Sequence, residues 1–210
     1  MTYIKDPMTI ETKSFEIIEA IMAENDWIFP DENSHIYKRV IHTSADFDYL
    51  QNLKIKPEFI SRIKSAIQQP LTVYTDTQMV LSGINKSALG KTPWTLKCFV
   101  SSPEAHARAN QKQITRSMAA IELAMEEPGD KLFVIGNAPT SIFQLLSMQV
   151  QVDEAVIGII GVPVGFVGAV ESKQALYESG IPSIVALGRK GGSNIAATII
   201  NAILYDTVGR

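Results

Sequence analysis

Three histidines are the side chains of this 210-residue chain best suited to proton transfer near neutral pH, because imidazole titrates there unaided. His35 and His106 lie in charged stretches with a helical pattern, which favours a solvated role for each. His42 follows the apolar pair Val40-Ile41 at the end of an expected helix. There it can be a simple cap stabilised by the helix dipole, or it can do acid–base work. Its position alone leaves both interpretations open.

A glycine-rich segment, residues 188–193 with the sequence GRKGGS, is the second candidate for chemistry. Glycines let backbone N–H groups approach a ligand, the start of the following helix favours anions, and Arg189 and Lys190 add positive charge. The other interpretation is a flexible turn with solvated charges. The segment lacks the pattern GxxxxGK[ST], and the glycines of residues 161–168 do not match GxGxxG. We therefore expect no nucleotide cofactor.

Other kinds of reactive site find little support. His35 and His42 are seven positions apart, which does not suit a zinc pair on one helix face, and no third ligand accompanies them. A GxSxG nucleophile motif is absent. Cys98 is the only cysteine, so an internal disulfide, a CxxC redox pair and a four-cysteine zinc site are all excluded. Because Cys98 falls inside an expected strand, we predict a buried, inert thiol.

Composition narrows the class of protein further. Nineteen basic against 22 acidic residues give a net charge of −3, which provides no general attraction for nucleic acid. No apolar run approaches 18 residues, and the polar N-terminus does not have the pattern of a signal peptide. We expect a cytoplasmic protein that binds neither nucleic acid nor a membrane.

Apolar runs bounded by Gly or Pro predict the strands that position these residues. Three runs in the C-terminal half are each followed by a segment of helical length, the arrangement typical of parallel βαβ units. Two further strands are expected in the N-terminal half. The five predicted strands cover residues 71–74, 95–100, 132–135, 155–160 and 183–187. We predict one domain over residues 1–210: a doubly wound α/β fold with a mainly parallel five-stranded sheet and helices on both faces.

Helical periodicity predicts what covers this sheet. A long helix is expected to begin after Ser102, with Ile114, Met118, Ile121 and Met125 along one face. Further helices are predicted around residues 15–22, 59–67, 76–82, 140–148, 168–178 and 194–205. Ligands of such folds bind beyond the carboxyl ends of the strands. Segment 188–193 should therefore lie on that rim, together with residues 76, 136–137 and 161–168.

Seven motifs, in this order along the chain, resemble those of the precorrin-8X methylmutases, the cobalt-precorrin-8 methylmutases included. The resemblance covers residues 3–205. Each motif is weak alone, but seven in order at compatible spacing are highly specific. They are Arg39-Val40-Ile41-His42, Asp76-Thr77-Gln78-Met79-Val80, Thr115-Arg116-Ser117, Gly136-Asn137-Ala138-Pro139-Thr140, Pro163-Val164-Gly165-Phe166-Val167, Glu171-Ser172-Lys173 and Gly188-Arg189-Lys190-Gly191-Gly192-Ser193.

The resemblance implies an isomerase of corrin biosynthesis with a flavodoxin-like fold. The family moves a methyl group from carbon 11 to carbon 12 of a tetrapyrrole, giving hydrogenobyrinate or its cobalt-containing counterpart, cobyrinate. Members are homodimers with the site near the subunit interface. An intramolecular methyl shift needs no nucleophile, no cofactor and no protein-bound metal. Whether the substrate already carries cobalt is left open.

The resemblance also implies roles for individual residues. His42 matches the catalytic histidine, which would donate a proton or hydrogen bond to the ring C nitrogen. The substrate carries several carboxylate arms around an apolar ring, so it calls for cations and neutral donors. Ser14 and Arg116 match substrate-contacting positions of the family. The full set of expected substrate-binding residues is Ser14, Arg39, Asn85, Arg116, Arg189, Lys190, Gly191, Gly192 and Ser193.

Two alternatives remain beside the isomerase. A protein that sequesters a corrinoid without converting it would have nearly the same residues, because catalysis rests on one imidazole. A flavodoxin-like phosphate or nucleotide binder could use the glycine-rich rim. Loss of turnover in a His42→Ala variant that still binds product would argue against the first, and purification without a bound flavin or nucleotide against the second.

Overall fold

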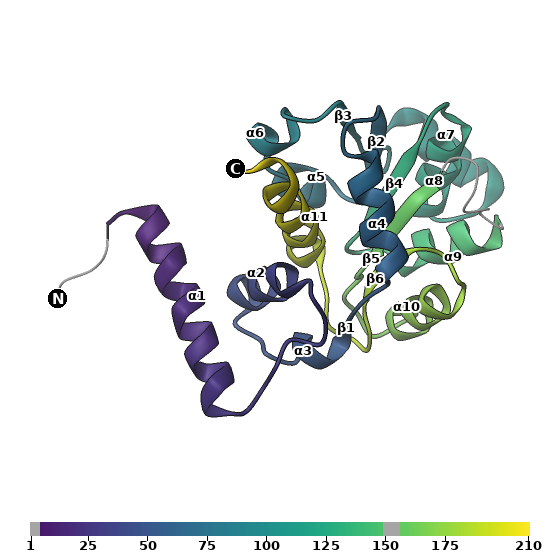
Figure 1. Ribbon diagram of the computed structural model, residues 1–210. Helices are drawn as coiled ribbons and strands as arrows, with labels where there is room; N and C mark the ends of the chain where they lie inside the picture. The colour runs from purple at the N-terminus through teal and green to yellow at the C-terminus, as the bar shows by residue number, and fades with distance from the viewer. Residues whose placement is uncertain (1–4, 149–155) are drawn as a thin grey trace.

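A six-stranded sheet lies at the centre of the computed structural model, which describes residues 5–148 and 156–210 (Figure 1). Its strands are β1 (Leu53–Ile55), β2 (Leu71–Thr75), β3 (Trp94–Lys97), β4 (Lys131–Ile135), β5 (Val156–Gly161) and β6 (Ser183–Ala186). They pair in the order β1-β6-β5-β4-β2-β3. Every neighbouring pair is parallel except β1 and β6.

The five parallel strands follow the flavodoxin-like order. Numbered 1 to 5 along the chain, β2 to β6 lie in the spatial order 2-1-3-4-5. This confirms the predicted doubly wound, mainly parallel sheet. The strand order reverses at β2: β3 lies on one side of it, and β4 to β6 follow on the other. The switch point of the fold therefore lies between β2 and β4. Ligand-binding loops of such folds gather at that point.

The predicted number of strands is wrong, because β1 adds a sixth strand at the edge. β1 has three residues, too few for a recognisable pattern, and Lys54 interrupts its two apolar residues. It pairs antiparallel with β6, with Leu53 opposite Ala186 and fully buried. Hydrogen bonds from Lys56 N to Ser183 O at 3.0 Å and from Leu187 N to Asn52 O at 2.8 Å extend the pairing.

Helices cover both faces of the sheet, as predicted. Side chains of β4 alternate between two cores: Leu132 and Val134 pack on one face, Phe133 and Ile135 on the other. The first core includes residues of α1, α2, α4, α5 and α11, and the second includes residues of α8, α9 and α10. The helices are α1 (Pro7–Glu24), α2 (Ser34–Ser44), α3 (Tyr49–Asn52), α4 (Pro57–Ala66), α5 (Gln78–Gly83), α6 (Lys86–Leu89), α7 (Pro103–Lys112), α8 (Arg116–Glu126), α9 (Pro139–Ser147), α10 (Ala169–Glu178) and α11 (Ser193–Val208). In the described residues, no helix is both long and apolar enough to cross a bilayer.

The single long helix predicted after Ser102 is instead a pair of helices, α7 and α8. Gln113 adopts the left-handed conformation at φ 54° and ends α7. The side chain of Thr115 then accepts a hydrogen bond from Met118 N at 3.2 Å and caps the start of α8. Ile114 therefore belongs to the connection rather than to a helix face. The apolar stripe continues across this break, which is why periodicity alone did not reveal it.

Two smaller predictions about strand residues also change. β3 ends at Lys97, so Cys98 follows the strand and is half-buried rather than enclosed within it. The predicted strand of residues 155–160 corresponds to β5, which begins at Val156. Ala155, the predicted first residue, lies outside the described residues.

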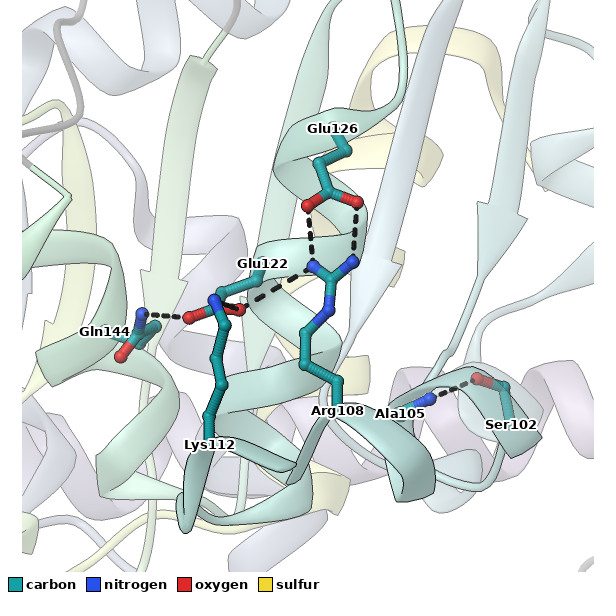
Figure 2. Close-up of polar contacts among 7 residues, drawn as sticks. All are labelled: Ser102, Ala105, Arg108, Lys112, Glu122, Glu126 and Gln144. Carbon is teal, nitrogen blue, oxygen red and sulfur yellow. Dashed lines mark hydrogen bonds and ion pairs between the residues drawn. The ribbon is translucent and has the colours of Figure 1, made fainter. Parts of the chain in front are cut away.

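Charged side chains hold α7 against α8 (Figure 2). Arg108 donates two parallel hydrogen bonds to Glu126, at 2.7 and 2.8 Å, and lies 3.6 Å from Glu122. Lys112 pairs with the same Glu122 at 2.6 Å, and Gln144 of α9 donates to its other oxygen at 3.2 Å. A network of this kind, centred on a bidentate arginine, contributes more than isolated surface pairs. It joins three helices, α7, α8 and α9, through the second half of α8.

Gly136 allows the end of β4 to approach α11 closely, which gives a stability prediction. A Cβ at this position would lie 2.6 Å from Ser193 Cα and 2.9 Å from Ser193 N, both backbone atoms. Gly136→Ala should lower the free energy of unfolding by about 1–3 kcal/mol in a urea titration. Ser101→Ala, at an exposed turn, is the matched control and should change it little. An unchanged midpoint for Gly136→Ala would contradict this packing.

Candidate active site

His42 lies in the last turn of α2, as predicted, and its side chain is exposed. Ala45 ends the helix in the left-handed conformation, with its N–H bonded to Ile41 O at 2.7 Å. The imidazole meets the Phe15 ring of α1 edge-on, with the ring centres 5.4 Å apart. Within the described parts of the chain, neither ring nitrogen of His42 has a hydrogen-bond partner. A helix end thus orients an imidazole whose nitrogens are both available for a ligand.

A cavity of about 180 Å³ opens beside His42, between α1, α2 and α11. Its walls carry charged, hydroxyl and amide groups around one tyrosine ring. The cavity is smaller than typical small-molecule pockets, which span roughly 300–1,000 Å³. The lining residues are Glu11, Arg39, His42, Thr43, Thr198, Asn201, Tyr205 and Arg210.

Arg39 joins the three helices that form this cavity. Its guanidinium donates to Glu11 Oε1 of α1 at 3.0 Å. Its Cζ lies 5.4 Å from the centre of the Phe15 ring and 4.6 Å from that of Tyr205 in α11. An arginine between two aromatic faces combines cation–π attraction with its ion pair. Arg39 therefore lies one helical turn from His42 and is already engaged within the protein.

Asn85 lies behind the same cavity. Its side-chain oxygen caps α6 by accepting from Ala88 N at 3.0 Å, and its amide nitrogen donates to the Tyr205 hydroxyl at 3.0 Å. The backbone N–H of Asn85 donates to Asn201 Oδ1 at 2.8 Å. Through Tyr205 the structure connects Asn85 with Arg39, although the two residues are distant in sequence.

Ser14 lies on α1 next to Phe15 and is half-buried. Its hydroxyl donates to Ile10 O at 2.8 Å within the helix. By helical spacing it borders the face that packs on α2, which includes Ile18, and the outward face that carries Ile10 and Ile17. Ser14, predicted to contact the substrate, is not among the residues that line the cavity beside His42.

At the switch point between β2 and β4, a buried carboxylate organises the rim. Asp76 is 3 % exposed and accepts hydrogen bonds from Gly136 N at 3.0 Å and from Asn137 N and Ala138 N at 2.7 Å each. Burial raises the pKa of Asp76, and the three N–H donors act in the opposite direction. The adjacent Thr77 contacts Ser193 hydroxyl to hydroxyl at 3.0 Å. Sequence patterns placed Asp76 on the rim without revealing this role.

Segment 188–193 lies on the same rim, packed against the loop that follows β5. A Cβ on Gly191 would come within 2.1 Å of Val162 O, and φ at Gly191 is 149°, so only glycine fits. Gly192 N donates to the same Val162 oxygen at 2.8 Å. No described side chain caps the start of α11, so the helix presents its first N–H groups at this rim.

The two cations of this segment differ in their surroundings. Lys190 pairs with Asp46 at 2.5 Å and Asp48 at 2.6 Å, and these carboxylates raise its pKa to about 12. Arg189 is exposed and lies over the ring of Phe166, with its Cζ 5.8 Å from the ring centre. The Phe166 ring is itself 85 % exposed. Of the two, Arg189 is the cation that remains open to a ligand.

Arg116 begins α8 at another part of the rim and is exposed. Its Nη1 lies 3.3 Å from His106 Nε2, and the neighbouring Thr115 donates to Thr140 of α9 at 3.2 Å. No contact within the described residues links Arg116 to the cavity beside His42. The predicted binding residues thus form two groups in one chain: His42, Arg39, Asn85 and Ser14 near α1 and α2, and the rim residues Arg116, Arg189, Lys190, Gly191, Gly192 and Ser193.

Sequence reasoning missed several residues of the cavity. Glu11, Tyr205 and Arg210 come from the two ends of the chain and meet only in the folded structure. Arg210 pairs with Glu11, and its Cζ lies 4.8 Å from the centre of the Tyr205 ring. No motif contains them, and their spacing carries no signal without tertiary contacts.

The fold and this site define a doubly wound α/β protein with an available imidazole at the end of α2 and, on the rim of the sheet, exposed arginines and the uncapped start of α11. A model of the precorrin-8X methylmutase family matches residues 9–206. A cobalt-precorrin-8 methylmutase of Salmonella typhimurium is 49 % identical over 209 residues, which cover 98 % of each chain. The chain belongs to the precorrin-8X methylmutase family and is an isomerase of cobalamin biosynthesis, which confirms the resemblance of its motifs.

More distant relatives agree with this assignment. A precorrin-8X methylmutase of Sinorhizobium sp is 34 % identical, with 96 % of this chain and 95 % of the relative covered. The solved structure of a precorrin-8X methylmutase from Thermus thermophilus has a TM-score of 0.81 at 29 % identity. It covers 93 % of this chain, and 95 % of the solved chain is matched.

The packing of α1 against the rest of the protein should weaken in acid, because it includes the ion pairs of Glu11 with Arg39 and Arg210. Burial alone would raise the pKa of Glu11, but hydrogen bonds and charges from Arg39 and Arg210 lower it overall. The folded pKa lies below the unfolded one, so this stabilisation is present above the ordinary value of 4.5 and is lost as the pH falls through the folded pKa. Between about pH 7 and about pH 3, Glu11→Gln should therefore lose less unfolding free energy than the wild type. The control Glu24→Gln, at the exposed end of α1, should behave as wild type; equal pH dependence in all three proteins would contradict the assignment.

Proposed function

We propose that this protein moves a methyl group from carbon 11 to carbon 12 of cobalt-precorrin-8 and so produces cobyrinate. Membership of the methylmutase family supports the reaction class. The cobalt form is favoured because the relatives that share 49 %, 37 % and 36 % identity are all named cobalt-precorrin-8 methylmutase. The two relatives named precorrin-8X methylmutase share 34 %. Cobalt is part of the substrate in this proposal.

His42 is the residue we propose to drive the shift. The observation that carries this role is an exposed imidazole whose two ring nitrogens have no partner among the described residues, held edge-on to Phe15. A proton or hydrogen bond donated to the ring C nitrogen would draw electron density from the migrating centre. The bond from carbon 11 to the methyl group breaks as the bond to carbon 12 forms, and the proton returns to His42. Substrate and product are isomers, so no electrons are gained or lost.

The remaining residues would hold the ring rather than react with it. Arg116 and Arg189 are exposed cations that suit carboxylate arms, and the uncapped start of α11, from Ser193 on, adds backbone N–H groups. Ser14 and Asn85 would contribute neutral hydrogen bonds. Arg39 and Lys190 already have carboxylate partners, so their proposed contacts with substrate require shared or exchanged ion pairs. Fixing the macrocycle in its reactive conformation supplies the rest of catalysis.

Replacing His42 tests the proposed role. The methyl shift alters conjugation, so turnover of cobalt-precorrin-8 or metal-free precorrin-8 can be followed by absorbance. His42→Ala should lower the rate about 10²–10⁴-fold, the usual contribution of a positioned acid, while product binding persists. His35→Gln, on the same helix but away from the cavity, is the matched control and should keep the wild-type rate.

Three other outcomes would each mean something different. A faster reaction with metal-free precorrin-8 would overturn the cobalt assignment and leave the mechanism intact. Full activity of His42→Ala would remove the acid from the mechanism. Tight binding of both compounds by the wild type without any spectral change would indicate a corrinoid-binding protein instead of an isomerase.

We also propose that two copies of the chain assemble and that the second copy completes the site, in a cytoplasmic homodimer. The cavity beside His42 is too small for a macrocycle with carboxylate arms. Ile10 and Ile17, on the outward face of α1, are 44 % and 49 % exposed, and Ser14 borders them. Figure 1 shows α1 at the edge of the molecule beside α2, where a second copy could cover that face. The only cysteine, Cys98, is consistent with a reducing compartment.

Charges on the outward face of α1 should separate the copies. The double variant Ile10→Asp/Ile17→Asp should sediment as a monomer and lose activity, because the apolar contact and the completed site disappear together. Thr12→Asp places one charge on the opposite, exposed side of the same helix and should remain a dimer with wild-type activity. A dimeric double variant, or a wild type that sediments as a monomer, would contradict the proposal.

A further inference from the structure

Lys173 is a fully buried lysine for which the proposed mechanism has no use. It lies on α10, which packs against α9 and β6, and its side chain is 0 % exposed. Neither α9 nor β6 contains a charged residue. Burial lowers the pKa of Lys173 to about 8, and in the described structure no carboxylate bonds to its ammonium. Buried charges are usually paired, so an unpaired ammonium calls for an explanation.

The ammonium reaches the glycine-rich segment from beneath. Lys173 Nζ donates to the backbone oxygen of Lys190 at 2.7 Å. On the other side of the same peptide group, the backbone of Gly191 lies near the hydroxyl of Tyr49, a buried residue of α3. The peptide between Lys190 and Gly191 is therefore held at its carbonyl by a side chain of α10. Its orientation cannot reverse without breaking that hydrogen bond.

Fixing this peptide determines what segment 188–193 presents to a ligand. The Lys190 side chain is directed to Asp46 and Asp48, and its carbonyl oxygen points inward to Lys173. An inward carbonyl keeps a partial negative charge away from the rim. The exposed guanidinium of Arg189 and the uncapped start of α11 are left facing outward. The positive charge of Lys173 then lies directly below an anion-binding arrangement and is not cancelled by a neighbouring carboxylate.

We propose that Lys173 is a positioning residue for carboxylate recognition: its buried ammonium holds the Lys190 carbonyl inward and keeps the 188–193 rim cationic for an arm of the substrate. This inference rests on the proposed function, because it takes the ligand to be a corrin polycarboxylate. Lys173 itself does not touch the ligand in this proposal.

The test compares a charged ligand with a neutral one. Cobyrinate carries free carboxylates, and its fully esterified methyl ester has the same ring without their charge. Lys173→Met keeps the length of the side chain and removes its charge. We expect about tenfold weaker binding of cobyrinate by Lys173→Met and a change of less than about twofold for the ester. Lys64→Met removes an exposed charge from α4 and should leave both affinities within about twofold.

The wild type provides a second measurement that does not depend on a folded variant. Lys173 loses its proton near pH 8, so affinity for cobyrinate should fall between about pH 7 and about pH 9 while affinity for the ester stays level. The ammonium bonds to the backbone of Lys190, whose side chain pairs with Asp46 and Asp48. Lys190 and Tyr49 have pKa values raised to about 12, so neither titrates between about pH 7 and about pH 9.

The outcomes separate this inference from the function on which it rests. A purely structural lysine would lower the unfolding midpoint of Lys173→Met and weaken cobyrinate and the ester equally, which would overturn the proposal. A wild-type affinity for cobyrinate that is level from about pH 7 to about pH 9 would overturn it as well. If the wild type binds neither compound, the proposed function is wrong, and so is this inference, which rests on it.

Discussion

The carboxylate of Asp76 is the constraint on which both sides of the site depend. The turn after β4 directs three backbone N–H groups to one place; those of Gly136 and Ala138 are buried, and that of Asn137 is partly buried. Asp76 accepts all three and so satisfies donors that would otherwise cost about 1–3 kcal/mol each. The turn that it fixes opens α9, and Thr77 beside it meets Ser193 at the start of α11. One buried acid thereby sets where two ligand-facing helices begin.

From its start at Ser193, α11 runs to the end of α2, where His42 lies, and helps to position it. Thr198 meets Thr43 of α2 hydroxyl to hydroxyl at 3.0 Å, one turn past the start of α11. Farther along, Tyr205 stacks on Arg39 and accepts from Asn85. The end of α2 is therefore aligned to the helix that Asp76 and Thr77 position. α1 adds Glu11 and Phe15 to this assembly and packs on the core through Ile18 and Met22.

The sequence was most informative where chemistry is local. Apolar runs ending in glycine predicted β4 to β6, and the apolar pair Val40-Ile41 before His42 predicted that His42 lies at the end of a helix. β1 could not be predicted, because three residues carry no periodicity and its pairing with β6 is a tertiary contact. The break between α7 and α8 escaped for a related reason: a left-handed Gln113 leaves no signal that glycine would have left. In the site, motifs located His42 and residues 188–193, but the partners of Arg39 come from both chain ends.

Ion pairs at the site show that residue types alone overestimate how many cations are free to bind the substrate. From the sequence alone, four cations are expected to bind the carboxylates of the substrate: Arg39, Arg116, Arg189 and Lys190. In the folded chain, Glu11 engages Arg39, and Asp46 and Asp48 engage Lys190, which leaves Arg116 and Arg189 exposed on the rim. Under the proposed function, two open cations and a helix start would bind a large anion whose remaining arms stay in water. An intramolecular methyl shift gains little from tighter binding, since only interactions stronger in the transition state raise its rate. In this proposal, selectivity depends on how buried groups such as Asp76 and Lys173 hold the rim.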